Sequence, residues 1–243
     1  MKNIAAVALL LSACAVQAAG TVEVHMAGSS QPKTLTEVEH LADLVGQPRL
    51  ADSWWPGAVM AEKQATVVAE RQRQELLGRL AALTAEDGGD DGAVIQSLRR
   101  QLLAIRVTGR QFVRLDPDYV RIASHGNPPL EGQYSLWVGP QPTTVRVVGL
   151  ISRPGKVAFT PGRDVADYLA EMSLLSGADR SYAWVIYPDG RQQKAPVAYW
   201  NKRHIEPMPG STIFVGFADS LWTKKYAVLN GDILRTLAQR IPE

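Results

Sequence analysis

The fold is decided by the stretch Val145-Arg146-Val147-Val148-Gly149-Leu150-Ile151, which Arg153-Pro154-Gly155 ends. The β-branched residues of this stretch favour a strand. The proline and glycine after it favour a turn, because proline presets one turn dihedral and glycine supplies the positive one. A hairpin is therefore predicted, with its return strand over residues 156–159.

The residues that follow this hairpin predict a helix and two further strands. Asp164 is a good N-cap, and the apolar residues after it recur at spacings of four and three before a stop near Gly177. Residues 184–187 and 212–217 favour strands. The order strand, strand, helix, strand, strand is that of a β-grasp, a small sheet wrapped around one helix. We therefore predict a β-grasp domain over residues 143–218.

The first half of the chain repeats the beginning of this plan. Residues 21–26 alternate apolar and polar side chains, the period of a half-buried strand. Thr36-Glu37-Val38-Glu39 has the form of a capping box and predicts the start of a helix. Residues 130–138 place a glycine before an apolar closing strand, as residues 208–215 do. An internal duplication follows, with another β-grasp domain over residues 19–139.

A helical hairpin is predicted to interrupt this first domain over about residues 58–106. Each of its helices carries one apolar stripe, made of Leu76, Leu77, Leu80 and Leu83 and of Val94, Leu98, Leu102 and Ile105. The acidic stretch 86–92 is predicted to be the turn between them. After the hairpin the sheet is expected to resume with strands over residues 112–115 and 119–122, and residues 139–142 are expected to link the two domains.

The end of the chain predicts an amphipathic helix over residues 221–241. Its apolar face carries Trp222, Tyr226, Leu229, Ile233 and Leu237. Such a face can dock on its own domain, enter the groove of a partner protein or lie on a membrane surface. The predicted fold class is thus α+β, with two β-grasp domains, a helical hairpin inserted in the first, and a C-terminal amphipathic helix.

The first eighteen residues predict export. A lysine, a short apolar run over residues 4–13 and small residues ending at Ala18-Ala19 are typical of a secretory signal peptide, and the run is too short to span a bilayer. We expect a signal peptide over residues 1–18 and a periplasmic protein. Leu11-Ser12-Ala13-Cys14 also has the form of a lipobox, so a lipoprotein acylated at Cys14 is the alternative.

Composition argues against several classes of protein. The chain has 26 basic and 24 acidic residues, a balance that does not suggest binding of nucleic acid. Its four histidines, His25, His40, His125 and His204, lie far apart without the spacing of metal ligands. We therefore expect no metal and no cofactor.

Several motifs carry a family resemblance. They are Trp54-Trp55-Pro56-Gly57, Thr108-Gly109-Arg110, Leu115-Asp116-Pro117-Asp118, Asn127-Pro128-Pro129-Leu130 and Trp200-Asn201-Lys202-Arg203-His204-Ile205-Glu206-Pro207. Because these motifs follow one another in this order over residues 21–242, the chain resembles the capsule biosynthesis GfcC family. Its second half is similar to the soluble ligand-binding β-grasp domain of polysaccharide export proteins. The resemblance implies a periplasmic accessory protein of capsule or exopolysaccharide assembly. Its implied partners are a polysaccharide, which can be anionic, and the outer-membrane export machinery.

Arg110 is the first candidate for ligand binding, because it matches an arginine that stands out in the family motif. Its planar guanidinium group suits bidentate binding of a carboxylate or phosphate. We expect the preceding glycine to let the backbone bend, so that this group can enter a cleft. The alternative is an ion pair with Asp116, Asp118 or Glu131. Asp116 is itself a second candidate for ligand binding.

Two clusters of aromatic and basic residues complete the candidates. Trp54 and Trp55 can stack on sugar rings, or can seal a core instead. Lys202, Arg203 and His204 can bind an anionic glycan, or can form a solvated basic turn.

Two classes of function compete for this chain. One is a non-catalytic module that binds polysaccharide or export machinery. The other is an enzyme that modifies or cleaves the glycan with carboxylates near Arg110, since glycoside hydrolysis needs two carboxyl groups about 5 to 10 Å apart. Asp116 and Asp118 flank a proline in a predicted turn, where such residues commonly bond their own backbone. We therefore favour the binding module, without catalytic residues.

Overall fold

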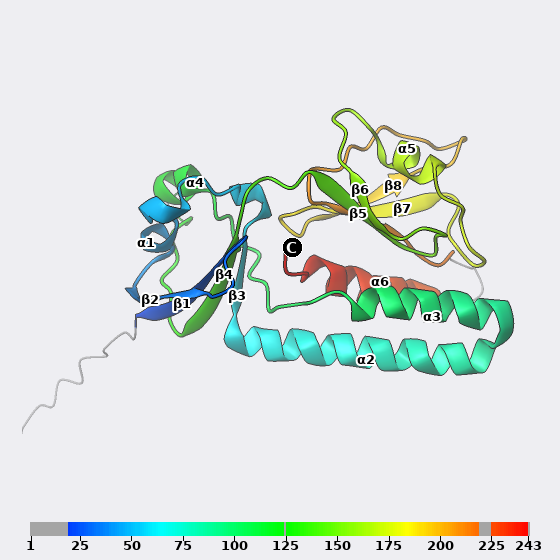
Figure 1. Ribbon diagram of the computed structural model, residues 1–243, viewed down its shortest axis with the longest axis horizontal. Helices are drawn as coiled ribbons and strands as arrows, with labels where there is room; N and C mark the ends of the chain where they lie inside the picture. The colour runs from blue at the N-terminus through cyan, green and yellow to red at the C-terminus, as the bar shows by residue number, and fades with distance from the viewer. Residues whose placement is uncertain (1–18, 124, 219–224, 243) are drawn as a thin grey trace, which may run out of the picture.

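The computed structural model describes residues 19–123, 125–218 and 225–242, so the expected signal peptide and Cys14 lie outside the described residues. Two sheets lie side by side (Figure 1). The first sheet has the order β2-β1-β4-β3 and consists of β1 (Gly20–Met26), β2 (Lys33–Val38), β3 (Val59–Glu62) and β4 (Gln133–Val138).

The second sheet has five strands in the order β6-β5-β9-β7-β8. They are β5 (Thr144–Gly149), β6 (Gly155–Ala158), β7 (Tyr182–Ile186), β8 (Gln192–Pro196) and β9 (Thr212–Val215). In both sheets the first strand pairs antiparallel with the second and parallel with the last, which in turn pairs antiparallel with the third. The repeated pairing confirms the predicted α+β fold with a duplicated β-grasp plan.

Short helices cover one face of each sheet. In the first domain these are α1 (Leu41–Val45), the 3-10 turns η1 (Pro48–Leu50) and η2 (Trp55–Gly57), and α4 (Pro117–Ile122). In the second domain, α5 (Val165–Ala170) packs on the sheet through Val165, Tyr168 and Leu169. The N-cap predicted at its start is confirmed, because Asp164 Oδ1 accepts a hydrogen bond of 2.8 Å from the Asp167 amide.

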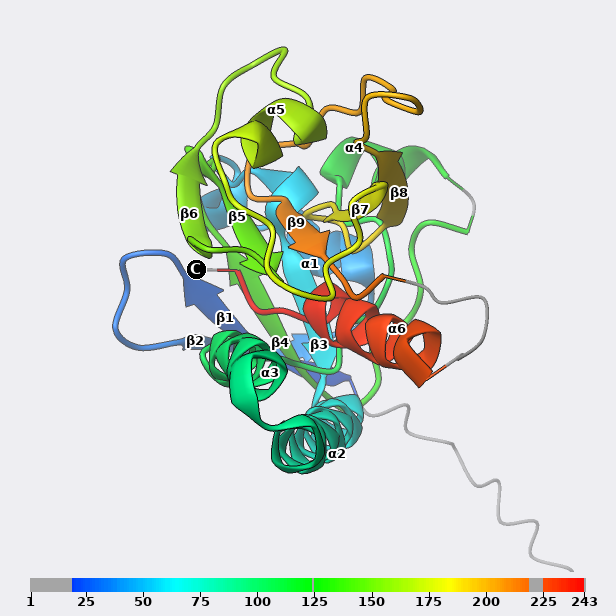
Figure 2. The ribbon, with the colours of Figure 1, turned by 90° about the vertical axis from the view of Figure 1, so that its right-hand side faces the viewer.

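The helical hairpin belongs to the first domain by sequence but packs against the second. α2 (Lys63–Asp87) and α3 (Gly89–Leu103) leave the sheet after β3, and their buried leucines share one core with the second sheet. In α3, the Gln101 side chain donates to Gly149 O at 3.0 Å and accepts from Gly149 N at 2.8 Å. Figures 1 and 2 show the hairpin and the C-terminal helix beneath the second sheet, with α5 on the opposite face. The first domain keeps a separate core.

The C-terminal helix, α6 (Lys225–Ala238), buries its apolar face on its own protein. The side chains of Leu229, Ile233 and Leu237 are at most 4% exposed. The ring of Tyr226 stacks on Phe217 with a centroid distance of 4.8 Å. Of the three predicted alternatives, α6 thus adopts docking on its own protein, against the second domain. Trp222, predicted to belong to this face, lies outside the described residues. None of the described helices is long and apolar enough to cross a membrane.

Three local predictions are wrong. Residues 36–38 belong to β2, because Leu35 and Val38 on either side of a register shift both pair with β1, and α1 begins only at Leu41. Residues 112–115 form no strand, and residues 119–122 are helical in α4, where Asp116 caps the helix and a proline occupies its first turn. The stretch predicted as the acidic turn is mostly helical as well, since only Gly88 separates α2 from α3.

Candidate functional site

Thr108-Gly109-Arg110 lies between the first sheet and the segment that follows α6. Its backbone extends along β3, with an isolated bridge between Ala61 and Arg110, and on the other side Thr108 N donates to Gln239 O at 2.9 Å. Gly109 is required for close packing rather than for a bend, since a Cβ atom there would lie 2.2 Å from the backbone of α2. The motif therefore joins the two domains at one point.

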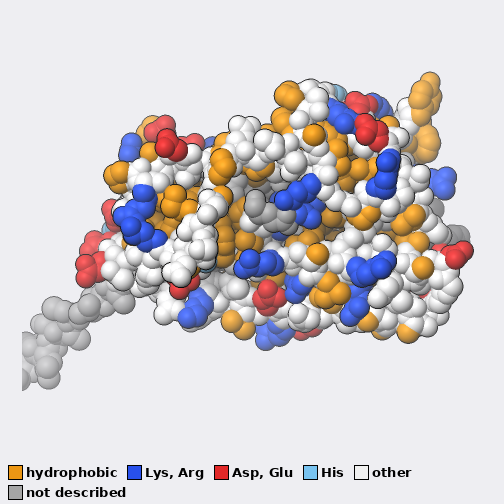
Figure 3. Space-filling model, in the orientation of Figure 1, with side chains coloured by type: hydrophobic (Ala, Val, Ile, Leu, Met, Phe, Trp, Pro, Cys, Tyr) orange, Lys and Arg blue, Asp and Glu red, His pale blue; other side chains and the backbone are white. Residues whose placement is uncertain are grey.

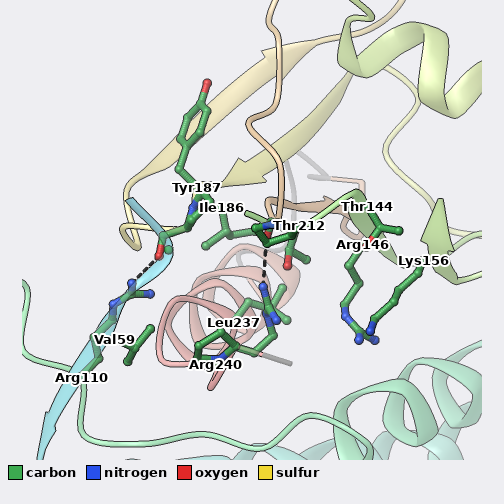
Figure 4. A pocket seen from close by; sticks show the side chains of 15 residues that line it. Val59, Arg110, Thr144, Arg146, Lys156, Ile186, Tyr187, Thr212, Leu237 and Arg240 are labelled. Carbon is green, nitrogen blue, oxygen red and sulfur yellow. Dashed lines mark hydrogen bonds between the residues drawn. The ribbon is translucent and has the colours of Figure 1, made fainter. Parts of the chain in front are cut away.

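The Arg110 side chain is buried at this junction, with 9% of its surface exposed. Its guanidinium donates to Ala238 O, at the end of α6, at 3.1 Å, and to Pro188 O, in the β7–β8 turn (Figure 4). Its hydrogen bonds thus go to two backbone carbonyls, and not to the carboxylates that the sequence offered as alternatives. Burial lowers the pKa of Arg110 to about 10, while nearby Asp189 raises it and Arg240 lowers it further. The guanidinium therefore stays charged at neutral pH.

A groove of about 630 Å³ opens beside Arg110, between the two domains. From the first domain it is lined by Trp55, Pro56, Ala58 and residues 110–116, and from the second by Asp189, Gly190, Arg191 and Met208. The ring of Phe112 is 62% exposed, and Trp55 is half-buried against the core of the first domain. The groove thus combines aromatic faces with arginine side chains.

A smaller pocket of about 60 Å³ lies where the linker meets the second sheet, and Arg110 lines it as well as the groove (Figure 4). Arg146 from β5, Lys156 from β6 and Arg240 after α6 also line this pocket. Figure 3 shows Lys and Arg side chains gathered at the middle of this face, next to β5. Four cationic side chains therefore surround a single small cavity.

Of the two adjacent tryptophans, only Trp55 reaches the groove. The Trp54 ring lies against Gly57, where a Cβ atom would be 2.5 Å from it, and Trp54 N donates to Gly139 O at 2.9 Å. Trp54 therefore fixes the turn before β3 to the linker between the domains.

Lys202, Arg203 and His204 lie away from Arg110, at the start of α5. Lys202 Nζ is 3.2 Å from the Asp164 carboxylate and 2.9 Å from that of Asp167. This contact, above all the hydrogen bond to Asp167, raises the pKa of Lys202 and in turn lowers that of Asp167. His204 Nδ1 is 3.7 Å from Asp164, and Arg203 is exposed. Lys202 and His204 thus contact the N-terminal cap of α5, and none of the three residues lines the groove or the pocket.

Asp116 lines the groove but is engaged as a helix cap. Its Oδ1 accepts hydrogen bonds from Asp118 N at 2.9 Å and Tyr119 N at 3.1 Å. These contacts match the expectation that the acidic residues of this motif bond their own backbone. Among the described residues, no group of three His, Cys, Asp or Glu side chains could hold a metal ion.

Sequence reasoning missed most of the residues that surround Arg110. Phe112 and Asp189 lie in connections, and the sequence gives no signal that both line one groove. Arg146 did carry a signal, because it alternates with buried valines in β5 and must therefore face the other side of the sheet. The aromatics Tyr199 and Trp200, in the turn after β8, are 99% and 74% exposed. Of the two, only Trp200 belongs to a motif identified in the sequence, and Tyr199 was missed.

Fold and site together define a duplicated β-grasp protein with a groove at the junction of its domains. The chain belongs to the capsule biosynthesis GfcC family: the N-terminal profile of the family matches residues 18–141, and the C-terminal profile matches residues 153–242. It is 67% identical over 239 residues, 98% of each chain, to the uncharacterized protein YjbG of Escherichia coli (strain K12). The family resemblance is thereby confirmed, and the role of the chain lies in capsule biosynthesis.

Proposed function

We propose that this chain is a non-catalytic periplasmic accessory protein of capsule or exopolysaccharide assembly that binds the polysaccharide in the groove beside Arg110. The observation that carries the proposal is the lining of the groove. An exposed phenylalanine and a half-buried tryptophan offer flat apolar faces to sugar rings, and arginines at both walls offer donors to sugar oxygens. The expected signal peptide supports the periplasmic location.

The acidic residues of the groove favour binding over hydrolysis. Those among its described lining residues are Asp116 and Asp189. Asp116 caps α4, and Asp189 Oδ2 lies 2.5 Å from Nε of Arg191. A glycosidase needs one carboxyl group that keeps a proton and a second that acts as nucleophile or base. Two carboxylates committed to a helix cap and an ion pair do not provide this pair.

The turn after β8 supports contact with a partner protein, which we propose is the export machinery. Tyr199 and Trp200 are exposed, although the turn itself is fixed by hydrogen bonds of Asn201 to Ala198 and Ser181. In Figure 1 this orange-yellow loop projects from the second domain, away from the hairpin. Large aromatic side chains held at the tip of an ordered turn are typical of residues that anchor an interface.

Binding of the surface polysaccharide to the purified protein tests the groove. Phe112→Ser should weaken binding about fivefold, on the order of 1 kcal/mol, because it removes an exposed ring from the groove. Ile122→Ser is the matched control, since Ile122 is 85% exposed and does not line the groove. Equal effects of both variants would contradict the proposal. Shortened or chemically altered polysaccharide after incubation would support the enzyme instead.

A further inference from the structure

The strand β8 forms one edge of the second sheet. It pairs with β7 on one side and is the last strand in the order of that sheet (Figure 2). Next to the β7–β8 turn, Tyr187 N donates to Arg191 O at 2.8 Å. Every second residue of an antiparallel strand exchanges hydrogen bonds with its partner strand, so from Arg191 onward the odd-numbered residues bond β7. The backbone groups of Gln192 and Lys194 therefore point outward.

This outer edge is accessible over residues 192–194, all of which are exposed. Within the part of the chain that the structure describes, the outward N–H and C=O groups of Gln192 and Lys194 bond no other segment. The accessible edge ends at Pro196, because proline has no N–H group and Pro196 O accepts a hydrogen bond of 3.3 Å from Arg203 N. Two N–H and two C=O groups are therefore available to a further strand.

An ordered loop with exposed aromatic side chains borders the end of this edge. Residues 197–202 leave β8 and return to it where Arg203 bonds Pro196. Tyr199 and Trp200, which we proposed as contacts for a partner protein, lie within this loop. A strand added along β8 would thus reach two large aromatic side chains, which are typical anchors of an interface.

Cationic side chains lie along the same edge. Lys194 is exposed, and its Nζ lies 4.0 Å from the centroid of the Tyr182 ring and 5.9 Å from that of Trp184. Among the described residues, Lys194 contacts these rings and forms no ion pair with a carboxylate. Arg203, which bonds the end of the edge through its backbone, has an exposed side chain. A segment with acidic side chains is therefore complementary in charge to this edge.

We propose that an extended, acidic segment of a protein of the export machinery adds to β8 as a further strand of the second sheet. Its backbone bonds Gln192 and Lys194, its acidic side chains meet Lys194 and Arg203, and an apolar side chain packs on Trp200. β8 begins directly after Arg191, which lines the groove. The added strand thus brings the export machinery next to the polysaccharide. The inference rests on the proposed function and deepens it, because it names how the partner binds.

A proline in the edge strand tests this assignment. Lys194→Pro removes an outward N–H group but no hydrogen bond to β7, so the fold should be retained. It should weaken binding of the purified outer-membrane polysaccharide export protein of the same organism about tenfold. Lys194→Gln keeps the N–H group and should weaken binding only about threefold, through the lost charge. Ala158→Pro is the matched control, because Ala158 points its N–H group outward from β6 at the opposite edge, and it should leave binding unchanged.

Hydrogen exchange separates strand addition from a contact made by side chains alone. Mass spectrometry should show that the export protein slows amide exchange of residues 192–194 in the wild-type chain, a measurement that decides the question even if Lys194→Pro unfolds. Trp200→Ser should weaken binding about thirtyfold.

The outcomes separate this inference from the proposed function. If Trp200→Ser weakens binding but residues 192–194 gain no protection, the partner contact stands and strand addition is overturned. Equal effects of Lys194→Pro and Ala158→Pro overturn it as well. If the export protein does not bind, or if sedimentation shows that β8 instead pairs two copies of this chain, the inference fails together with the proposed partner. Binding of polysaccharide in the groove is tested separately, by Phe112→Ser.

Discussion

Replacing Arg110 by methionine should loosen the junction between the two domains. The substitution keeps the buried stem but removes the hydrogen bonds to Ala238 O and Pro188 O. Each hydrogen bond from a charged donor contributes about 1.5–3 kcal/mol, so the two contribute about 3–6 kcal/mol. Burial opposes this gain, as the lowered pKa of Arg110 shows, and we therefore expect a loss at the lower end, about 3 kcal/mol.

For a chain of this length, a loss of about 3 kcal/mol lowers the melting temperature by about 6–12 °C. Thermal unfolding followed by circular dichroism and tryptophan fluorescence measures the shift. Arg114→Met is the matched control, because Arg114 is exposed, lines the same groove and packs over Tyr119, with Cζ 4.1 Å from the ring centroid. It should change the melting temperature by less than about 2 °C.

A melting temperature of Arg110→Met within about 2 °C of the wild type would refute this reasoning. The two hydrogen bonds to carbonyl groups would then add nothing to stability, and the main role of Arg110 would be to bind a ligand. If Arg110 served only to bind ligand, Arg110→Ala would keep the thermal stability and reduce function. The contacts of the buried guanidinium reverse the first half of that expectation, while the second half remains a prediction, since Arg110 lines both cavities.

Two further predictions concern packing and pH. Gly109→Ala should cost about 3 kcal/mol in urea unfolding, because its Cβ would lie 2.2 Å from the backbone of α2, and an unchanged midpoint would contradict this. His25 stacks on Trp137, and burial lowers its pKa below 6.5 despite the opposing charge of Glu23. Between the lowered pKa and 6.5 the unfolded chain binds more protons, so stability rises with pH in this window. His25→Gln should remove that slope, and an NMR titration giving a pKa above 6.5 would rule out the explanation.

The elements that sequence predicts well are those with local signals. The β5–β6 hairpin follows from β-branched residues and a Pro-Gly turn, and the start of α5 follows from Asp164. Prediction fails where two local signals compete. Residues 112–122 contain alternating apolar side chains, but Asp116-Pro117 is also a helix start, and the helix formed because the carboxylate satisfies two free amides.

The site is less predictable because its parts come from distant segments. Arg110 could be identified from its motif, but its carbonyl partners lie 78 and 128 residues further along the chain. No periodicity or turn signal encodes such contacts. Arg146 and Lys156 are different, because strand alternation and hairpin register place both on one face of the sheet. Sequence could therefore have predicted this pair of cations, although not the pocket in which they lie.

The inserted hairpin explains why a groove can persist between the two domains. A flexible linker alone would let two small sheets turn relative to each other, and residues contributed by both would not stay together. Here α2 and α3 leave the first sheet and share the hydrophobic core of the second, and Gln101 holds α3 to the end of β5. Because the hairpin returns to the first sheet through Thr108-Gly109-Arg110, the segment that closes this connection also supplies the buried guanidinium. The position of Arg110 is thus a consequence of how the two domains are interlocked.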